Sequence, residues 1–225
     1  MDILAIGEIL IDLTQTGTDA KGIPQFAANP GGAPANLAVA AARLGAQTAF
    51  IGKVGADGFG AYLTSVLQEN GVDVSGIAVD PEDPTTVAVV SVDASGERSF
   101  SFYRKANADV KLSAADIPDQ ALQSARMVHF GSVSLTADPS RSATLDAVRR
   151  AKASGAVITY DPNYRANLWP DVDTAVAQMK APLDLVDILK VSDEELPLLT
   201  GTTDYEAGTA LLAEQGIRLV FVTLG

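Results

Sequence analysis

Two adjacent glycines open the stretch of this sequence that is best suited to binding a ligand. Gly31 and Gly32 precede an alanine-rich run that predicts a helix beginning near Ala35, with Asn36 in its first turn and Gly45 at its end. Because glycine has no Cβ atom, the backbone there can turn sharply and approach a ligand closely. The start of the helix offers unpaired N–H groups and the positive end of a dipole. The amide of Asn36 both donates and accepts hydrogen bonds, which suits the hydroxyl groups of a carbohydrate.

A second candidate for ligand binding is Asp12. It ends the run Ile3–Leu13, which is nearly continuous in apolar residues apart from Gly7 and Glu8. Such a run is typical of a strand that is buried on both faces. In open α/β sheets ligands bind beyond the carboxyl ends of the strands, so Asp12 is expected to face a cleft. The alternative is that Asp12 caps a turn or a helix.

The stretch PGGAPANLAVAAARLGAQTAFIGKVG, from Pro30 to Gly55, resembles the first signature of the PfkB (ribokinase-like) family of carbohydrate kinases. Its variant GGAPAN, with Pro34, is most similar to the fructokinases of that family. An ordinary helix with a glycine-rich entry is the alternative, since motif matches carry false positives. The resemblance implies a ribokinase-like α/β fold. It also implies transfer of a phosphoryl group from Mg-ATP to the 6-hydroxyl of fructose.

The resemblance further assigns residues to the sugar substrate. Segments 14–30 and 85–105 are expected to form a small β lid, since the second splits into two β-rich runs around the hairpin signal Asp93–Gly96. FYRKANAD resembles the end of the fructokinase lid, which brings Phe102 and Arg104 towards the sugar and excludes water. The alternatives are a solvent-facing hairpin and a homodimer contact made by the lid. The residues implied to orient the sugar are Asp12, Gly31, Gly32 and Asn36.

A later motif resembles the region that meets the transferred phosphoryl group. DPNYR, from Asp161 to Arg165, resembles the fructokinase DPNxR, in which the arginine reaches that group, and it adds Asn163 to the substrate-binding residues. A guanidinium supplies forked donors to phosphate oxygens and stabilises developing charge. The alternative is a surface arginine that follows a turn.

The motif KVSDEEL, which begins at Lys190, is also similar to the fructokinases, with Ser192 in place of the family's asparagine. Glu195 is expected to hold the water shell of Mg²⁺, an ion that keeps several waters and prefers oxygen ligands. Ser192 and Glu195 also have the spacing of a helix capping box, and the two interpretations are compatible. The final residues, TLG, resemble the start of the family's nucleotide-binding turn. Lys190, Ser192, Thr223 and Gly225 are therefore expected to border ATP.

Members of the family carry a second signature, rich in glycine, that the resemblance places after Gly225. Its glycines form an anion hole at a helix N-terminus, and its aspartate takes the proton from the primary hydroxyl of the sugar. No such stretch occurs in Met1–Gly225. The general base, most of the adenine pocket and any K⁺-binding loop are therefore expected beyond Gly225, and residues 1–225 alone are expected to show no turnover.

Three other functions stay open at the level of sequence. A 2-keto-3-deoxygluconate kinase would need a cation for the substrate carboxylate, and Arg104 or Lys105 would supply it. A ribokinase is disfavoured because its glycine motif usually carries a lysine where Ala33 stands. The third alternative is a sugar-binding or interaction module without chemistry.

Composition narrows the class of protein. The 225 residues are 47% hydrophobic, enough to bury a sizeable core in one domain, and the net charge of −12 argues against nucleic acid as a partner. No apolar run approaches the roughly 20 residues of a membrane span. The start MDILAIGEIL lacks the basic segment of a signal peptide. The absence of cysteine excludes disulfides and fits a cytoplasmic protein, and His129 is expected to be a hydrogen-bonded core residue.

A sheet must bring these scattered residues together. The sequence predicts one α/β domain over residues 1–225, with a mostly parallel sheet, helices on both faces and the β lid. Strands are expected over 47–54, 127–131, 156–160, 187–191 and 219–223. Helices are expected over 59–70, 119–124, 139–153 and 204–215.

Overall fold

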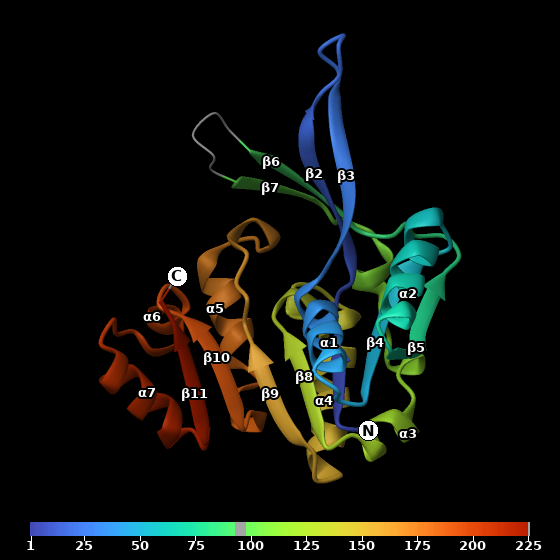
Figure 1. Ribbon diagram of the computed structural model, residues 1–225. Helices are drawn as coiled ribbons and strands as arrows, with labels where there is room; N and C mark the ends of the chain where they lie inside the picture. The colour runs from blue at the N-terminus through green and yellow to red at the C-terminus, as the bar shows by residue number, and fades with distance from the viewer. Residues whose placement is uncertain (93–97, 225) are drawn as a thin grey trace.

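Seven parallel strands form the central sheet, in the order β11-β10-β9-β8-β1-β4-β5 (Figure 1). The computed structural model describes residues 1–92 and 98–224 of the chain. From β1 the chain passes to β4 and β5 on one side of the sheet, and then to β8 and the strands after it on the other. The strands are β1 (Ile3–Ile6), β4 (Thr48–Gly55), β5 (Val72–Asp80), β8 (Met127–Gly131), β9 (Val157–Asp161), β10 (Ile188–Ser192) and β11 (Leu219–Thr223).

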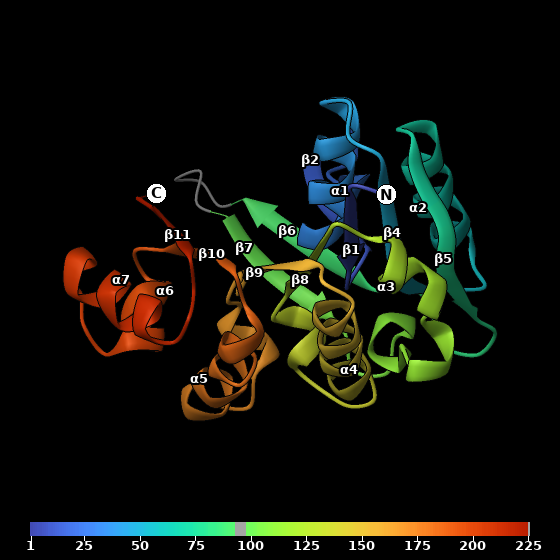
Figure 2. The same cartoon turned by 90° about the horizontal axis from the view of Figure 1, so that it is seen from below.

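Helices cover both faces of this sheet, which confirms the fold class that the sequence predicted. Figure 2 shows α1 and α2 on one side and α4 and α5 on the other. None of the helices in the described part of the chain is both long and apolar enough to cross a membrane. The helices are α1 (Ala33–Arg43), α2 (Gly58–Glu69), α3 (Asp119–Ser124), α4 (Ser140–Ala153), α5 (Val172–Lys180), α6 (Glu195–Thr200) and α7 (Tyr205–Glu214).

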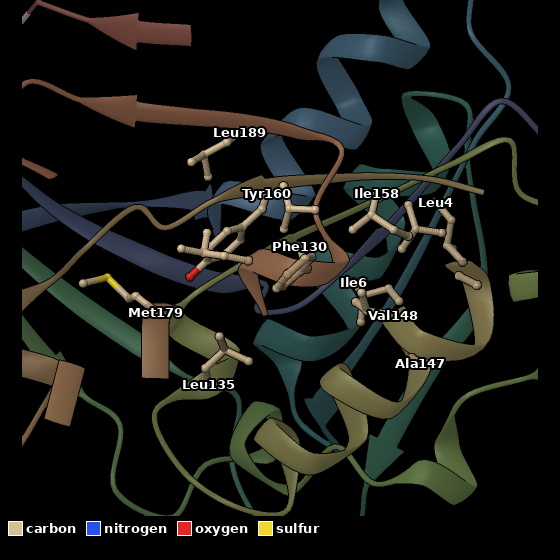
Figure 3. Packing of buried hydrophobic residues seen from close by; sticks show 14 of the residues in the cluster. Leu4, Ile6, Phe130, Leu135, Ala147, Val148, Ile158, Tyr160, Met179 and Leu189 are labelled. Carbon is tan, nitrogen blue, oxygen red and sulfur yellow. The ribbon is translucent and has the colours of Figure 1, made fainter. Parts of the chain in front are cut away.

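The core lies in two buried layers, one on each side of the sheet. Strand β1 contributes to both, because Leu4 and Ile6 belong to the larger layer and Ala5 to the smaller one. In the larger layer Phe130 of β8 stacks on Tyr160 of β9, with ring centroids 4.5 Å apart (Figure 3). This packing holds the carboxyl ends of β1, β8 and β9 in fixed positions beside one another.

His129 of β8 is the hydrogen-bonded core histidine that the sequence predicted. Its Nδ1 lies 2.9 Å from the hydroxyl oxygen of Thr159 on β9. Burial lowers the pKa of the imidazole to about 4, so the side chain is neutral at pH 7. The ring therefore serves the packing of the sheet.

A second sheet of four strands rises from the body and forms the β lid (Figure 1). In it β2 pairs antiparallel with β3 and parallel with β6, and β6 pairs antiparallel with β7. The turn expected at Asp93–Gly96 falls outside the described residues, apart from its flanking strands. The lid strands are β2 (Leu10–Thr18), β3 (Pro24–Gly31), β6 (Val87–Val92) and β7 (Arg98–Tyr103).

The run Ile3–Leu13 is not one strand, so that part of the sequence prediction was wrong. It breaks at Gly7, after which the chain leaves the central sheet and enters the lid as β2. Gly7 has φ +152°, and a Cβ there would lie 2.7 Å from Pro34 Cγ in α1. Asp12 therefore lies on a lid strand, beyond the carboxyl end of β1. Strand β5 was not predicted, because its sequence, VDVSGIAVD, mixes polar and small residues with the apolar ones.

Candidate active site

A polar cavity of about 410 Å³ opens beyond the carboxyl ends of β1, β8 and β9; we call it the Asp12 cavity. β1 and β8 are neighbours in the sheet, and the chain leaves them towards opposite edges. The cavity thus lies at a topological switch point, where open α/β sheets bind their ligands. Its lining is Glu8, Leu10, Asp12, Gly32, Ala33, Asn36, Phe102, Val133, Asn163 and Arg165.

The diglycine turn brings the main chain against the floor of this cavity. Gly32 has φ +102°, and a Cβ at this position would lie 2.4 Å from the main-chain oxygen of Glu8. A Cβ on Gly31 would lie 2.3 Å from Oδ2 of Asp12. Position 32 therefore requires glycine, whereas a side chain at position 31 would have to displace the side chains of Asp12 and Leu10. The turn delivers the start of α1, with Asn36, to the cavity.

Replacing Gly32 with alanine is expected to lower the free energy of unfolding by about 1–3 kcal/mol, because the residue is held in a conformation that L side chains rarely adopt. The clash with Glu8 adds to this cost. Urea unfolding of the variant measures it. Gly45→Ala is the matched control, since Gly45 has φ +94° but no atom within 4 Å of its Cβ position. Equal losses in the two variants would show that the contact with Glu8 is unimportant.

Asp12 projects from β2 into the cavity and faces Arg165. Burial raises the pKa of its carboxyl group, and the positive charge of Arg165 opposes that rise. The arginine thereby favours the ionised form of Asp12. A carboxylate in this position accepts hydrogen bonds only, which is the complement of a hydroxyl-rich ligand.

Glu8 also lines the cavity, and sequence reasoning did not assign it a role. Its side chain is buried, and its Oε1 accepts a hydrogen bond of 3.1 Å from the main-chain N–H of Ala33 at the start of α1. Its Oε2 is buried without a hydrogen-bond partner within the described part of the chain. Burial raises the pKa of the Glu8 carboxyl group to about 7. An acidic residue inside an otherwise apolar run was the available signal.

Glu8 should make the stability of the protein depend on pH. Its pKa rises from 4.5 to about 7 on folding, so its contribution to stability is greatest below pH 4.5 and is lost as the pH rises through 7. Relative to Glu8→Gln, the wild type is expected to lose about 2–3 kcal/mol of unfolding free energy between pH 5 and pH 8. Urea unfolding of both proteins at the two pH values measures this difference.

The pH dependence of the wild type alone does not isolate Glu8, so the change in unfolding free energy must be compared between the wild type and Glu8→Gln. His129 carries the opposite dependence, because its lowered pKa removes stability as the pH falls below 6.5. Gln at position 8 keeps an oxygen that can accept from Ala33, so the start of α1 stays capped. A pH-independent difference between wild type and Glu8→Gln would contradict the assignment of a neutral Glu8 in the folded protein.

A second cavity, of about 370 Å³, adjoins the first; we call it the Lys190 cavity. Asn163 and Arg165 line both cavities, so a group bound in one lies next to a group bound in the other. Asn163 has φ +45°, and its N–H donates to Oδ1 of Asp161 at 3.0 Å, which fixes the turn after β9. The lining is Asn163, Tyr164, Arg165, Lys190, Ser192, Glu194, Glu195 and Leu198.

Ser192 and Glu195 exchange the two reciprocal hydrogen bonds of a capping box, as their spacing predicted, in the turn that leads into α6. The N–H of Glu195 donates to Oγ of Ser192 at 3.1 Å, and its Oε2 accepts from the N–H of Ser192 at 2.8 Å. Oε1 accepts from the N–H of Tyr164 at 2.6 Å. Each carboxylate oxygen keeps a further lone pair for a metal-bound water. These oxygen donors are of the type that Mg²⁺ prefers, an ion that keeps several of its waters. Residues 1–92 and 98–224 contain no group of three or more His, Cys, Asp or Glu side chains that could hold a metal ion.

Residues 1–225 match the pfkB family carbohydrate kinases. The chain belongs to this family. Fructokinase-2 of Solanum lycopersicum is 43% identical over 226 residues, which cover 99% of this chain and 69% of the relative. Probable fructokinase-4 of Arabidopsis thaliana has the same identity and coverage.

Solved structures of PfkB kinases have the same fold. Fructokinase from Xylella fastidiosa superposes with a TM-score of 0.90 at 36% identity, covering 100% of this chain and 73% of that one. A double mutant of Vibrio cholerae O395 fructokinase, bound to fructose, ADP and potassium ion, superposes with a TM-score of 0.85 at 37% identity, covering 100% and 71%. The protein is therefore a sugar kinase with a ribokinase-like fold.

Two residues predicted to bind the sugar in this PfkB kinase, Gly31 and Arg104, are absent from the lining of the Asp12 cavity. Phe102 lines the Asp12 cavity from the lid, but Arg104 does not. The guanidinium of Arg104 is buried in an ion pair with Asp109, with Nε 2.6 Å from Oδ2. The prediction for Arg104 rested on the resemblance of FYRKANAD to the end of the fructokinase lid; in the structure Asp109, five residues along the chain, binds the guanidinium instead.

Two of the four residues predicted to border ATP, Lys190 and Ser192, lie together in the lining of the Lys190 cavity. The ammonium of Lys190 lies 3.3 Å from Oδ2 of Asp161. Thr223 ends β11 beside Ser192 and is absent from that lining, while its hydroxyl donates to the main-chain oxygen of Val191 at 3.4 Å. Gly225 lies outside the described residues.

Proposed function

We propose that the protein transfers the γ-phosphoryl group of Mg-ATP to the 6-hydroxyl of fructose. The observation that carries this proposal is the junction of the Asp12 and Lys190 cavities at Asn163 and Arg165. A polyol bound in the first cavity and a phosphate chain bound in the second would meet at this arginine. The likeness to a fructokinase bound to fructose and ADP supports the same arrangement.

The sugar would be held in the Asp12 cavity by groups of complementary type. Asp12 accepts hydrogen bonds from hydroxyl groups, and the amides of Asn36 and Asn163 both accept and donate. The glycine turn lets main-chain groups at Gly32 approach the sugar without a side chain between them. Phe102 covers the cavity from β7 and excludes water, which would otherwise compete as the phosphoryl acceptor.

Arg165 would act on the phosphoryl group during transfer. Phosphoryl transfer is catalysed mainly by positioning and by stabilising the charge on the transferred group. A guanidinium at the border of the two cavities presents several N–H donors to that group. Lys190 and Ser192, with Thr223 and Gly225 near the end of β11, would border the nucleotide.

Magnesium would be held near Glu195 through its water shell, and its chemistry would be to neutralise charge on the phosphates of ATP. Glu195 is already fixed in orientation by two main-chain N–H groups, at 2.6 and 2.8 Å. A bound K⁺ is also proposed, on the strength of the Vibrio cholerae O395 structure that holds this ion.

Fructose is favoured over 2-keto-3-deoxygluconate by the position of Arg104. A keto acid needs a cation for its carboxylate, and Arg104 is committed to Asp109. Among the described residues Arg165 is the only cationic side chain in the lining of the Asp12 cavity. A spectrophotometric coupled assay of the intact protein with each substrate tests the choice: a higher kcat/KM for fructose is expected, and preference for the acid would overturn it.

A homodimer through the lid is proposed as well. Phe59 and Tyr62 of α2 are exposed beside an apolar cavity of about 680 Å³, whose lining also includes Ala28 and Val87 of the lid strands. Exposed apolar patches of this kind mark protein contacts. Sedimentation equilibrium is expected to give a mass near twice 23.3 kDa for this chain, and a monomer at all concentrations would exclude the dimer. A cytoplasmic location is proposed from the absence of cysteine.

A further inference from the structure

Both ends of the β6–β7 hairpin meet the same buried carboxylate. Asp109 lies in the short 3₁₀ turn Ala108–Lys111. Its Oδ1 accepts a hydrogen bond of 2.6 Å from the hydroxyl of Thr86, the residue before β6. Its Oδ2 accepts one of 2.6 Å from Nε of Arg104, the residue after β7. The two points where the hairpin joins the body of the kinase are therefore tied to one side chain.

Arg104 extends this connection to the Asp12 cavity. Its Nη1 donates to the hydroxyl of Thr136 at 2.6 Å, and its Nη2 donates to the main-chain oxygen of Val133 at 3.1 Å. Thr136 donates to the same oxygen of Val133 at 2.8 Å. Val133 itself lines the cavity. The hairpin that carries Phe102 is thus bonded to the segment after β8 that forms part of the cavity wall.

Arg104 and Asp109 are both buried, so their ion pair is shielded from water. The side chains of Arg104 and Asp109 are 3% and 2% exposed. Removing two charges from water is costly, and apolar residues of similar volume often stabilise a protein as well as a buried ion pair does. A gain in stability is therefore a weak explanation for the presence of the Arg104–Asp109 ion pair. Four directional hydrogen bonds constrain the orientation of the lid ends relative to the cavity wall.

We propose that Asp109 is a positioning residue for the sugar: through Thr86 and Arg104 it holds the β6–β7 hairpin so that Phe102 covers the Asp12 cavity. Phe102 lies on β7, two residues before Arg104, so a displacement of Arg104 would also move Phe102. This inference rests on the proposed function, because fructose is the ligand whose affinity Asp109 would set. Asp109 does not line either cavity among the described residues, and its effect would be exerted through the lid.

Asp109→Asn tests this role, because the amide keeps the shape of the side chain and removes its charge. The expected result is a rise of about 10- to 100-fold in KM for fructose, since misplacement by about 1 Å of a group that positions substrate has effects of this size. KM for ATP should change less than threefold. The same loss should appear in the dissociation constant for fructose measured by calorimetry.

Asp116→Asn is the matched control. Asp116 forms a largely buried ion pair of 3.4 Å with Lys53, outside both cavities. This variant is expected to lower the unfolding temperature and to leave KM for fructose unchanged. A second variant, Arg104→Met with Asp109→Leu, removes both charges together and should recover much of the stability. Its fructose affinity should stay low; recovery to the wild-type value, or wild-type affinity in Asp109→Asn, would overturn the proposal.

Amide hydrogen exchange separates this inference from the proposed function. Peptides covering Val87–Val92 and Arg98–Tyr103 should exchange faster in Asp109→Asn than in wild type, without any sugar present. The same peptides should be unchanged in Asp116→Asn. If the wild type fails to bind fructose, the proposed function is wrong and the exchange result still decides whether Asp109 holds the hairpin. Unchanged exchange in Asp109→Asn would refute that role.

Discussion

Replacing Arg165 with alanine is expected to lower kcat for fructose phosphorylation by about 10³-fold, the lower end of the range for an arginine that stabilises a transferring phosphoryl group. Arg165 lines both cavities, and Nη1 donates to the main-chain oxygen of Tyr164 at 3.0 Å, which orients the guanidinium at their junction. Steady-state kinetics of the intact protein, at saturating fructose and Mg-ATP, measure the effect.

Two further variants show whether the loss comes from this position. Arg165→Lys keeps a charge but loses the planar fork of donors, so its kcat should fall between those of wild type and Arg165→Ala. Arg43→Ala removes an arginine at the end of α1 that bonds to Asn70, and it should leave kcat unchanged. A kcat for Arg165→Ala within threefold of wild type would exclude a role in stabilising the phosphoryl group.

Asp12→Asn is expected to weaken fructose binding by about 100-fold, because a hydrogen bond to a charged group contributes about 1.5–3 kcal/mol and the carboxylate can accept from two hydroxyl groups. The side chain lines the same cavity as Arg165, whose positive charge favours the ionised carboxylate. Isothermal titration calorimetry of fructose measures the change in dissociation constant.

The same substitution should not destabilise the protein at neutral pH. Because burial raises the pKa of Asp12, its ionised form costs stability, and this cost is relieved as the pH falls. Asp19→Asn is the control from the same β2–β3 hairpin, since Asp19 accepts from the N–H groups of Lys21 and Ile23 outside both cavities. Asp19→Asn should bind fructose like wild type; equal weakening in both variants would contradict a specific contact at Asp12.

Much of the site could be predicted because parallel strands end at one edge of a sheet. Asp12, Asn36, Asn163 and Arg165 are far apart in the sequence, yet all of them line one cavity. Local chemistry pointed to Asp12, at the end of an apolar run, and to Asn36, after a glycine pair; the resemblance of DPNYR to a fructokinase motif pointed to Asn163 and Arg165. The capping box of Glu195 was likewise visible in its spacing alone.

The residues that were missed depend on contacts between distant segments. From the sequence, Glu8 was interpreted as an interruption of a strand. Its hydrogen-bond partner, Ala33, lies beyond the whole β2–β3 hairpin in the sequence, so the contact could not be predicted. Arg104 was assigned to the sugar by resemblance to the fructokinase lid, and that resemblance does not show that Asp109 binds its guanidinium. In both cases the partner of a buried polar side chain is determined by the tertiary fold, and the periodicity of the sequence does not predict which residues will be in contact.

The most direct test of a hexose site in the Asp12 cavity is a crystal structure of the protein with fructose. The sugar is expected between Asp12, Asn36 and the Gly32 turn, with its 6-hydroxyl directed to the side of the cavity formed by Asn163 and Arg165. Fructose bound elsewhere, or bound here with its 6-hydroxyl turned away from Arg165, would contradict the assignment of this cavity.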